Sequence, residues 1–193
     1  MNISQPQPQP QTPSTNVDNF LSNDNFIVKK RGPGQPVSWE NFDTIILDAD
    51  STIWTCVNGD GDIIGAYQTV PPYTLGKPDE CYDSMGNKIK LRENFKQTFE
   101  QLKNSGKSIY MVTHSENQNL PQSQQPVYFI LQMFGIQELF DDIIIDGDEL
   151  KSESVEELQE GNTAFVDNDI NNLSDVANNT VDVVPIDAKK IKF

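Results

Sequence analysis

Residues 44–52, Thr-Ile-Ile-Leu-Asp-Ala-Asp-Ser-Thr, decide the fold class of this 193-residue chain. They begin with a short, nearly all-apolar run that ends in two acids, Asp48 and Asp50. Apolar runs of this length are typical of strands that are buried on both faces of a parallel sheet. Four later runs have the same character, and they lie at residues 108–113, 140–145, 163–167 and 181–186.

Helical patterns lie between these apolar runs. Phe95, Phe99 and Leu102 are spaced i, i+4 and i+7, as on the buried face of a helix. A second helix is predicted to begin near Pro121 and to end at Gly135. Strands that alternate with helices form βαβ units with right-handed crossovers. The sequence therefore predicts an α/β fold, a three-layer sandwich with a mainly parallel, Rossmann-like sheet.

One stretch, at about residues 54–91, breaks this alternation and contains no convincing helical pattern. Residues 58–61, Asn-Gly-Asp-Gly, lie between two β-prone runs and are typical of a hairpin turn. Residues 85–87, Met-Gly-Asn, indicate another turn. We expect these residues to form a β-hairpin flap that is inserted after the first strand.

The first 40 residues are expected to form a disordered or extended Gln/Pro-rich tail, because they contain too few apolar residues for a core. Their three acids and three bases cancel, so residues 41–193 carry the whole formal charge of −15. Within the tail, an apolar island at residues 20–28 could dock on the domain or on a partner protein. We therefore place the folded domain at residues 41–193.

The composition argues against several classes of protein. An excess of 29 acids over 14 bases disfavours binding to nucleic acid or to an anionic membrane. No apolar run approaches the roughly 20 residues of a membrane span, and no secretory signal is visible. One His and two Cys argue against a disulfide scaffold and against a structural zinc site. These features predict a cytoplasmic protein.

Polar side chains follow several of the predicted strands. Asp48 and Asp50 follow the first strand, Thr113 ends the second, Asp167 ends the fourth, and Lys151 comes soon after the third. Ligands of open parallel sheets bind outside the carboxyl ends of the strands. We therefore expect three carboxylates, a hydroxyl and an ammonium group to converge at one edge of the sheet.

This set of groups suits phosphoryl transfer assisted by Mg²⁺. A hard divalent cation would relieve the repulsion among the carboxylates of Asp48, Asp50 and Asp167. Beside such a cation one carboxylate can attack phosphorus, and a second can protonate the leaving oxygen. Lys151 and Thr113 can hold the phosphoryl oxygens as charge develops.

The same residues carry a family resemblance. Residues 45–54 resemble the first motif of the haloacid dehalogenase (HAD) superfamily, an apolar strand followed by DxDxT. Residues 110–113 are similar to its second motif and residues 165–169 to its fourth. Trp54 and the spacing within residues 167–176 resemble the magnesium-dependent phosphatase subgroup, which includes FkbH-type domains and carries a short β-flap. The resemblance covers about residues 42–187.

The resemblance implies a role for each candidate residue. Asp48 would be the nucleophile and a Mg²⁺ ligand, and Asp50 would be the acid/base, with its main-chain carbonyl on the metal. Asp167 would be a further metal ligand. Thr113 would bind the phosphoryl group, and Lys151 would be the lysine of the third motif. The expected activity is a Mg²⁺-dependent phosphomonoester hydrolase that forms an aspartyl-phosphate on a small phosphorylated metabolite or a phosphoprotein.

Two departures from the family pattern keep alternatives open. Asn168 stands where the family usually has a second adjacent acid, and the segment before Lys151 matches poorly. Lys151 could be a solvated surface charge, residues 167–169 could merely cap the following helix, and His114 could face solvent or touch substrate. The functional alternatives are a catalytically weakened HAD-fold binding or structural module, and FkbH-like phosphoglyceryl transfer.

Overall fold

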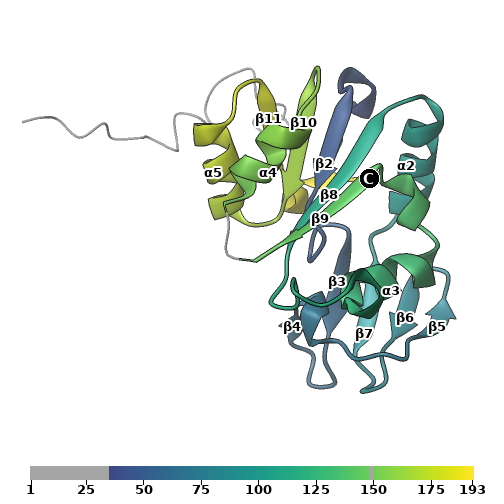
Figure 1. Cartoon of the computed structure of the whole chain (residues 1–193). Coiled ribbons are helices and arrows are strands. Elements are labelled where there is room, and N and C mark those ends of the chain that lie inside the picture. Colours follow the sequence, from purple (N-terminus) through teal and green to yellow (C-terminus); the bar gives the residue numbers. More distant parts are fainter. Residues whose placement is uncertain (1–34, 148–149) are drawn as a thin grey trace, which may run out of the picture.

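The computed structural model describes residues 35–147 and 150–193 (Figure 1). Residues 1–34 of the tail predicted for residues 1–40, and any partner that these residues bind, lie outside the described residues. Within the part that is described, no helix is long and apolar enough to span a membrane.

Five parallel strands form the main sheet, in the order β11-β10-β2-β8-β9. This confirms the five predicted apolar runs and the parallel α/β fold. The strands are β2 (Thr44–Leu47), β8 (Ser108–His114), β9 (Asp142–Asp146), β10 (Thr163–Asp167) and β11 (Val183–Asp187).

Two of these strands begin later than the sequence predicts. β9 begins two residues late because a 3₁₀ turn, Gln137–Leu139, is capped by Phe140. β11 begins two residues late because Asp182 has a left-handed backbone with φ 62°, outside the region that strands use.

Helices cover both faces of the main sheet and complete the predicted three-layer sandwich (Figure 1). Ile45 and Leu47 of β2 belong to the core cluster that also contains the apolar side chains of α2 and α3. Ile46 points to the opposite face and packs with the apolar side chains of α4 and α5. The helices are α2 (Phe95–Asn104), α3 (Pro126–Phe134), α4 (Lys151–Leu158) and α5 (Ile170–Asn179).

Helix α3 starts five residues later than the predicted start near Pro121. A 3₁₀ turn, Gln122–Gln124, comes first, and Gln125 is then extended with φ −82° and ψ 129°. The ring of Pro126 disfavours a helical conformation at the residue before it, whereas Pro suits the first helical position. The predicted end is confirmed, since Gly135 caps α3 with φ 60°.

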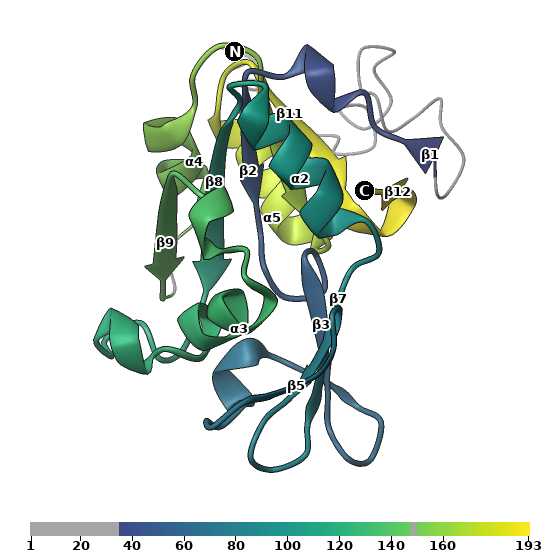
Figure 2. The same cartoon turned by 90° about the vertical axis from the view of Figure 1, so that its right-hand side faces the viewer.

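The predicted β-insertion after the first strand is present as a second, antiparallel sheet of five strands in the order β4-β3-β7-β6-β5. It extends from one end of the main sheet, next to α3 (Figure 2). Cys56, Cys81 and Ile89 are fully buried and join the core that includes α3. The strands are β3 (Trp54–Val57), β4 (Ile63–Ile64), β5 (Thr74–Lys77), β6 (Glu80–Tyr82) and β7 (Lys88–Leu91).

The packed core begins before the predicted boundary at residue 41. A short strand β1 (Gln35–Pro36) pairs in parallel with β12 (Ile191–Lys192) near the end of the described chain. Trp39 is buried and stacks on Phe193 with 5.8 Å between ring centroids. Trp39 therefore belongs to the domain, together with its buried neighbour Val37, because distant residues cover them.

Candidate active site

The candidate site lies where the strand order of the main sheet reverses. Connections from β2 lead to β8 and β9 on one side, whereas β10 and β11 lie on the other side of β2. Asp48 follows β2, Asp167 ends β10, and the main-chain N–H of Asp48 donates to the carbonyl of Val166 at 2.9 Å. The two carboxylates are therefore neighbours at the edge where open parallel sheets bind ligands.

Lys151 joins these two carboxylates. It is the first residue of α4, and its Nζ lies 2.5 Å from Oδ1 of Asp48 and 3.5 Å from Oδ2 of Asp167. The same ammonium donates to the carbonyl of Val112 at 2.8 Å. Lys151 is only 4% exposed, so the alternative of a solvated surface charge is wrong.

Burial and charge act in opposite directions on these three groups. Burial raises the pKa of Asp48, and the nearby ammonium of Lys151 opposes this rise. Burial and the charge of Asp48 together raise the pKa of Asp167 to about 6, again against the effect of Lys151. Burial alone would lower the pKa of Lys151, but the two carboxylates outweigh it and raise that pKa. The ammonium is therefore held in its charged form at neutral pH.

The capping alternative applies to Asp169 but not to Asp167. Asp169 is the N-cap of α5, and its side chain accepts from the N–H of Asn171 at 2.8 Å. The carboxylate of Asp167 instead accepts from the N–H of Asp169 at 2.7 Å and from Nδ2 of Asn172 at 2.9 Å. These two donors hold its carboxylate beside Lys151.

Asp50 is held by the flap rather than by the main sheet. Its Oδ1 accepts from the indole Nε1 of Trp54, and its Oδ2 accepts from the main-chain N–H of Ala66, both at 2.8 Å. Burial raises the pKa of Asp50, and these hydrogen bonds from Ala66 and Trp54 oppose the rise. The chain makes the sharp turn between Asp50 and Trp54 with Ser51 in a left-handed conformation, φ 60°.

One cavity of about 320 Å³ brings all five predicted site residues together: Asp48, Asp50, Thr113, Lys151 and Asp167 line it. Thr113 is 2% exposed and lies at the end of β8. The exposed His114 also lines the cavity, so its two predicted roles are not separated. The flap supplies one wall, formed by Ile63, Ile64, Gly65 and Tyr67.

The oxygen donors at this cavity fit a Mg²⁺ ion. The described residues contain no group of three or more His, Cys, Asp or Glu side chains arranged to hold a metal. Asp48 and Asp167 offer two carboxylates at this cavity, and the family resemblance implies the main-chain carbonyl of Asp50 as a further ligand. Mg²⁺ is commonly held by one or two carboxylates, with water and substrate phosphate completing its shell. Asn168 is already engaged, because its Oδ1 accepts from the hydroxyl of Thr52 at 3.3 Å.

Sequence reasoning missed several contributors to the site. The N–H donors of Trp54 and Ala66, and the amide of Asn172, come from residues that were assigned no role. The sequence did carry a signal for Trp54, because it is the last residue of the stretch that resembles the first motif. The N–H of Ala66 had none, because any residue type except Pro supplies a main-chain donor.

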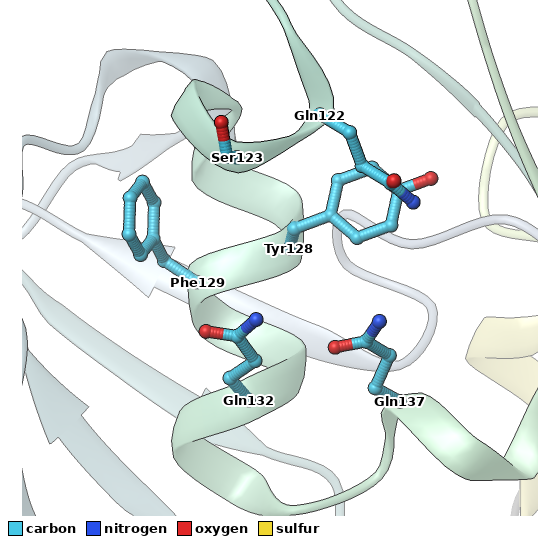
Figure 3. Close-up of a pocket in the computed structure, with 6 residues that line it drawn as sticks. All are labelled: Gln122, Ser123, Tyr128, Phe129, Gln132 and Gln137. Atoms are coloured by element: carbon cyan, nitrogen blue, oxygen red, sulfur yellow. The ribbon is translucent and has the colours of Figure 1, made fainter.

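A second cavity, of about 270 Å³, lies on α3 (Figure 3). Its lining contains no carboxylate, lysine or histidine, so it offers no charged side chain to a metal ion or a phosphoryl group. The six side chains that line it are Gln122, Ser123, Tyr128, Phe129, Gln132 and Gln137.

Comparison with known proteins adds little to this geometry. No family model matches the sequence, and no curated protein matches it. One matching solved structure is the crystal structure of an uncharacterized protein from Listeria monocytogenes serotype 4b, with 19% identity and a TM-score of 0.40. The match covers 65% of this chain and 66% of that chain, a little under two thirds of its length.

Proposed function

We propose that this chain is a Mg²⁺-dependent phosphomonoester hydrolase of the HAD superfamily, in the magnesium-dependent phosphatase subgroup. The observation that supports the proposal best is the buried ammonium of Lys151 between the carboxylates of Asp48 and Asp167. Burying these charged groups costs free energy, and they line a cavity that also contains the hydroxyl of Thr113 and a third carboxyl group, that of Asp50. Titratable groups whose pKa values are strongly shifted, and which line a cleft, indicate a functional site.

In this proposal Asp48 is the nucleophile. Its carboxylate oxygen attacks phosphorus, the bond to the ester oxygen breaks, and an aspartyl-phosphate forms on Asp48. Lys151 and Thr113 stabilise the charge that develops on the phosphoryl oxygens. Because Lys151 is already fixed by the carbonyl of Val112, its ammonium needs little reorganisation during the reaction.

Asp50 carries the protons. It donates a proton to the leaving oxygen, and as a carboxylate it then takes a proton from the water that attacks the aspartyl-phosphate. When bound by Asp48, Asp167 and the carbonyl of Asp50, Mg²⁺ would neutralise charge on the phosphoryl group. The proposed substrates are a small phosphorylated metabolite or a phosphoprotein, in the cytoplasm.

A binding module without turnover is the second candidate. Asn168 favours it, because an amide replaces the expected acid and its oxygen is occupied by Thr52. In this case the cavity would still hold a phosphoryl group, but the covalent step would be absent.

An assay on a panel of phosphomonoesters with Mg²⁺ tests the proposal. Turnover should disappear in Asp48→Asn, which keeps the shape of the side chain but removes the attacking charge. Beryllium fluoride should bind the unsubstituted protein as an aspartyl-phosphate mimic and should not bind Asp48→Asn. If the unsubstituted chain shows neither turnover nor beryllium fluoride binding, the enzyme proposal is wrong.

A further inference from the structure

We propose that Trp54 is a positioning residue for Asp50, and that the flap thereby holds the proton-transfer group of the site. This inference rests on the proposed phosphatase function. The indole N–H of Trp54 and the main-chain N–H of Ala66 donate to different oxygens of the Asp50 carboxyl group. They come from two separate parts of the inserted sheet region, β3 and the 3₁₀ turn Ala66–Gln68.

Two donors at two oxygens fix the plane of the carboxyl group. A carboxylate offers about four lone-pair positions, so two remain for the exchange of a proton with a ligand. Rotation about the Cβ–Cγ bond of Asp50 would break both 2.8 Å contacts at once. The free lone pairs therefore keep one direction relative to Asp48.

The two donors are themselves rigid. Trp54 is fully buried, pairs with Leu91 across β3 and β7, and accepts at its carbonyl from the N–H of Ser51 at 2.6 Å. Ala66 is 1% exposed. A side chain that is locked by packing positions its partner more precisely than one on a mobile loop. The flap thus has a use beyond covering the cavity.

Trp54 acts through Asp50 and exchanges no proton itself. When the bond between phosphorus and the ester oxygen breaks, that oxygen takes the proton of the Asp50 carboxyl group, and the indole N–H stays intact. Misplacing Asp50 should therefore lower kcat/KM, which reports the steps up to the aspartyl-phosphate, mainly for substrates whose leaving oxygen must be protonated. The leaving group of an aryl phosphate departs as a stabilised phenolate and depends little on this proton. The leaving group of an alkyl phosphate is a strongly basic alkoxide and depends on the proton strongly.

Trp54→Phe tests this role, because it removes the N–H donor and keeps an aromatic ring in the core. A well-positioned general acid accelerates a reaction about 100-fold or more. Because Trp54→Phe misplaces this acid but does not remove it, we expect kcat/KM for glycerol 2-phosphate to fall about tenfold. On p-nitrophenyl phosphate the loss should stay below about twofold. Ala66→Pro replaces the other N–H donor with a ring carbon that points at the Asp50 carboxyl group, so it should displace Asp50 and show the same selectivity. The extended backbone of Gly65, with φ −76° and ψ 153°, suits a following proline.

Trp39→Phe is the matched control, because it removes the second indole of the chain from a buried site against Phe99 and Phe193. It should change kcat/KM equally for both substrates. In an Asp50→Asn background Trp54→Phe should cause no further loss, since the residue that it positions no longer exchanges protons. Equal losses on both substrates in Trp54→Phe and Ala66→Pro, additive with Asp50→Asn, would overturn the inference while leaving the phosphatase proposal intact.

An NMR measurement keeps the two proposals separable. The indole ¹H–¹⁵N signal of Trp54 should shift in Asp50→Asn, and that of Trp39 should not. An unshifted Trp54 signal would overturn the positioning contact whether or not the chain is active. A shifted signal in a chain without any turnover would uphold the contact and overturn the phosphatase proposal, and with it the role of Trp54 in proton transfer.

Discussion

Replacing Lys151 by Met should destabilise the metal-free protein strongly at neutral pH. The substitution keeps the length of the side chain but removes an ammonium that contacts Asp48, Asp167 and the carbonyl of Val112. Asp48 is 6% exposed and Asp167 is 1% exposed, so water cannot replace the lost partner. Removing one member of a buried ion pair costs about 3–5 kcal/mol, because it leaves uncompensated charge. A typical domain has about 5–15 kcal/mol of unfolding free energy, so the loss is a large part of the whole.

Urea unfolding in the presence of a chelator measures this cost, and its pH dependence identifies the cause. Without the ammonium, the already raised pKa values of Asp48 and Asp167 should rise further. Both carboxyl groups then become neutral on mild acidification, so the difference between Lys151→Met and the unsubstituted protein should shrink as the pH falls.

Lys190→Met provides the matched control for an exposed pair. Lys190 lies 3.3 Å from Asp187 and its side chain is 48% exposed, so its loss should cost less than about 1 kcal/mol. If Lys151→Met and Lys190→Met unfold at the same urea concentration at neutral pH, the argument from a buried ion pair is refuted.

Three further predictions concern pH, the flap and the start of the domain. Because Asp167 has a pKa of about 6 in the folded state against a usual 3.8, the folded protein binds the proton more tightly. Asp167 should therefore contribute a fall in stability of about 3 kcal/mol without metal as the pH rises from about 4 to about 6, and Asp167→Asn should remove this contribution in urea titrations. Asp83 accepts from the N–H groups of Val70, Met85 and Asn87, which lower its pKa against the effect of burial. Asp83→Ala should cost about 1–3 kcal/mol at neutral pH, and the cost should shrink as the pH falls from the usual pKa of the carboxyl group through its lowered value in the folded state; an unchanged melting temperature at neutral pH would contradict this. Trp39→Ala should cost about 3–5 kcal/mol by chemical denaturation if the core begins before residue 41, and no measurable loss would restore the predicted boundary.

Most of the site could be placed from sequence, because strand ends converge in a parallel sheet. Asp48, Thr113 and Asp167 each end a short apolar run, and their common edge follows from the βαβ topology alone. The position of Lys151 could not be derived in this way. It lies in an acidic segment with no apolar signal, and only the packing of α4 brings its ammonium between two carboxylates 103 and 16 residues away in sequence.

The sequence alone determined the layered α/β fold, the β-insertion and the acids at the edge of the sheet, since these depend on local periodicity and on the ends of strands. The tertiary structure alone decided three things: the burial of Trp39, the pairing of Lys151 and the two donors that hold Asp50. Each of these three features depends on which residues, distant in sequence, pack close enough to exclude water or to donate a hydrogen bond. Residue type does not encode a main-chain donor such as the N–H of Ala66, and a short-range pattern does not report on contacts between distant segments.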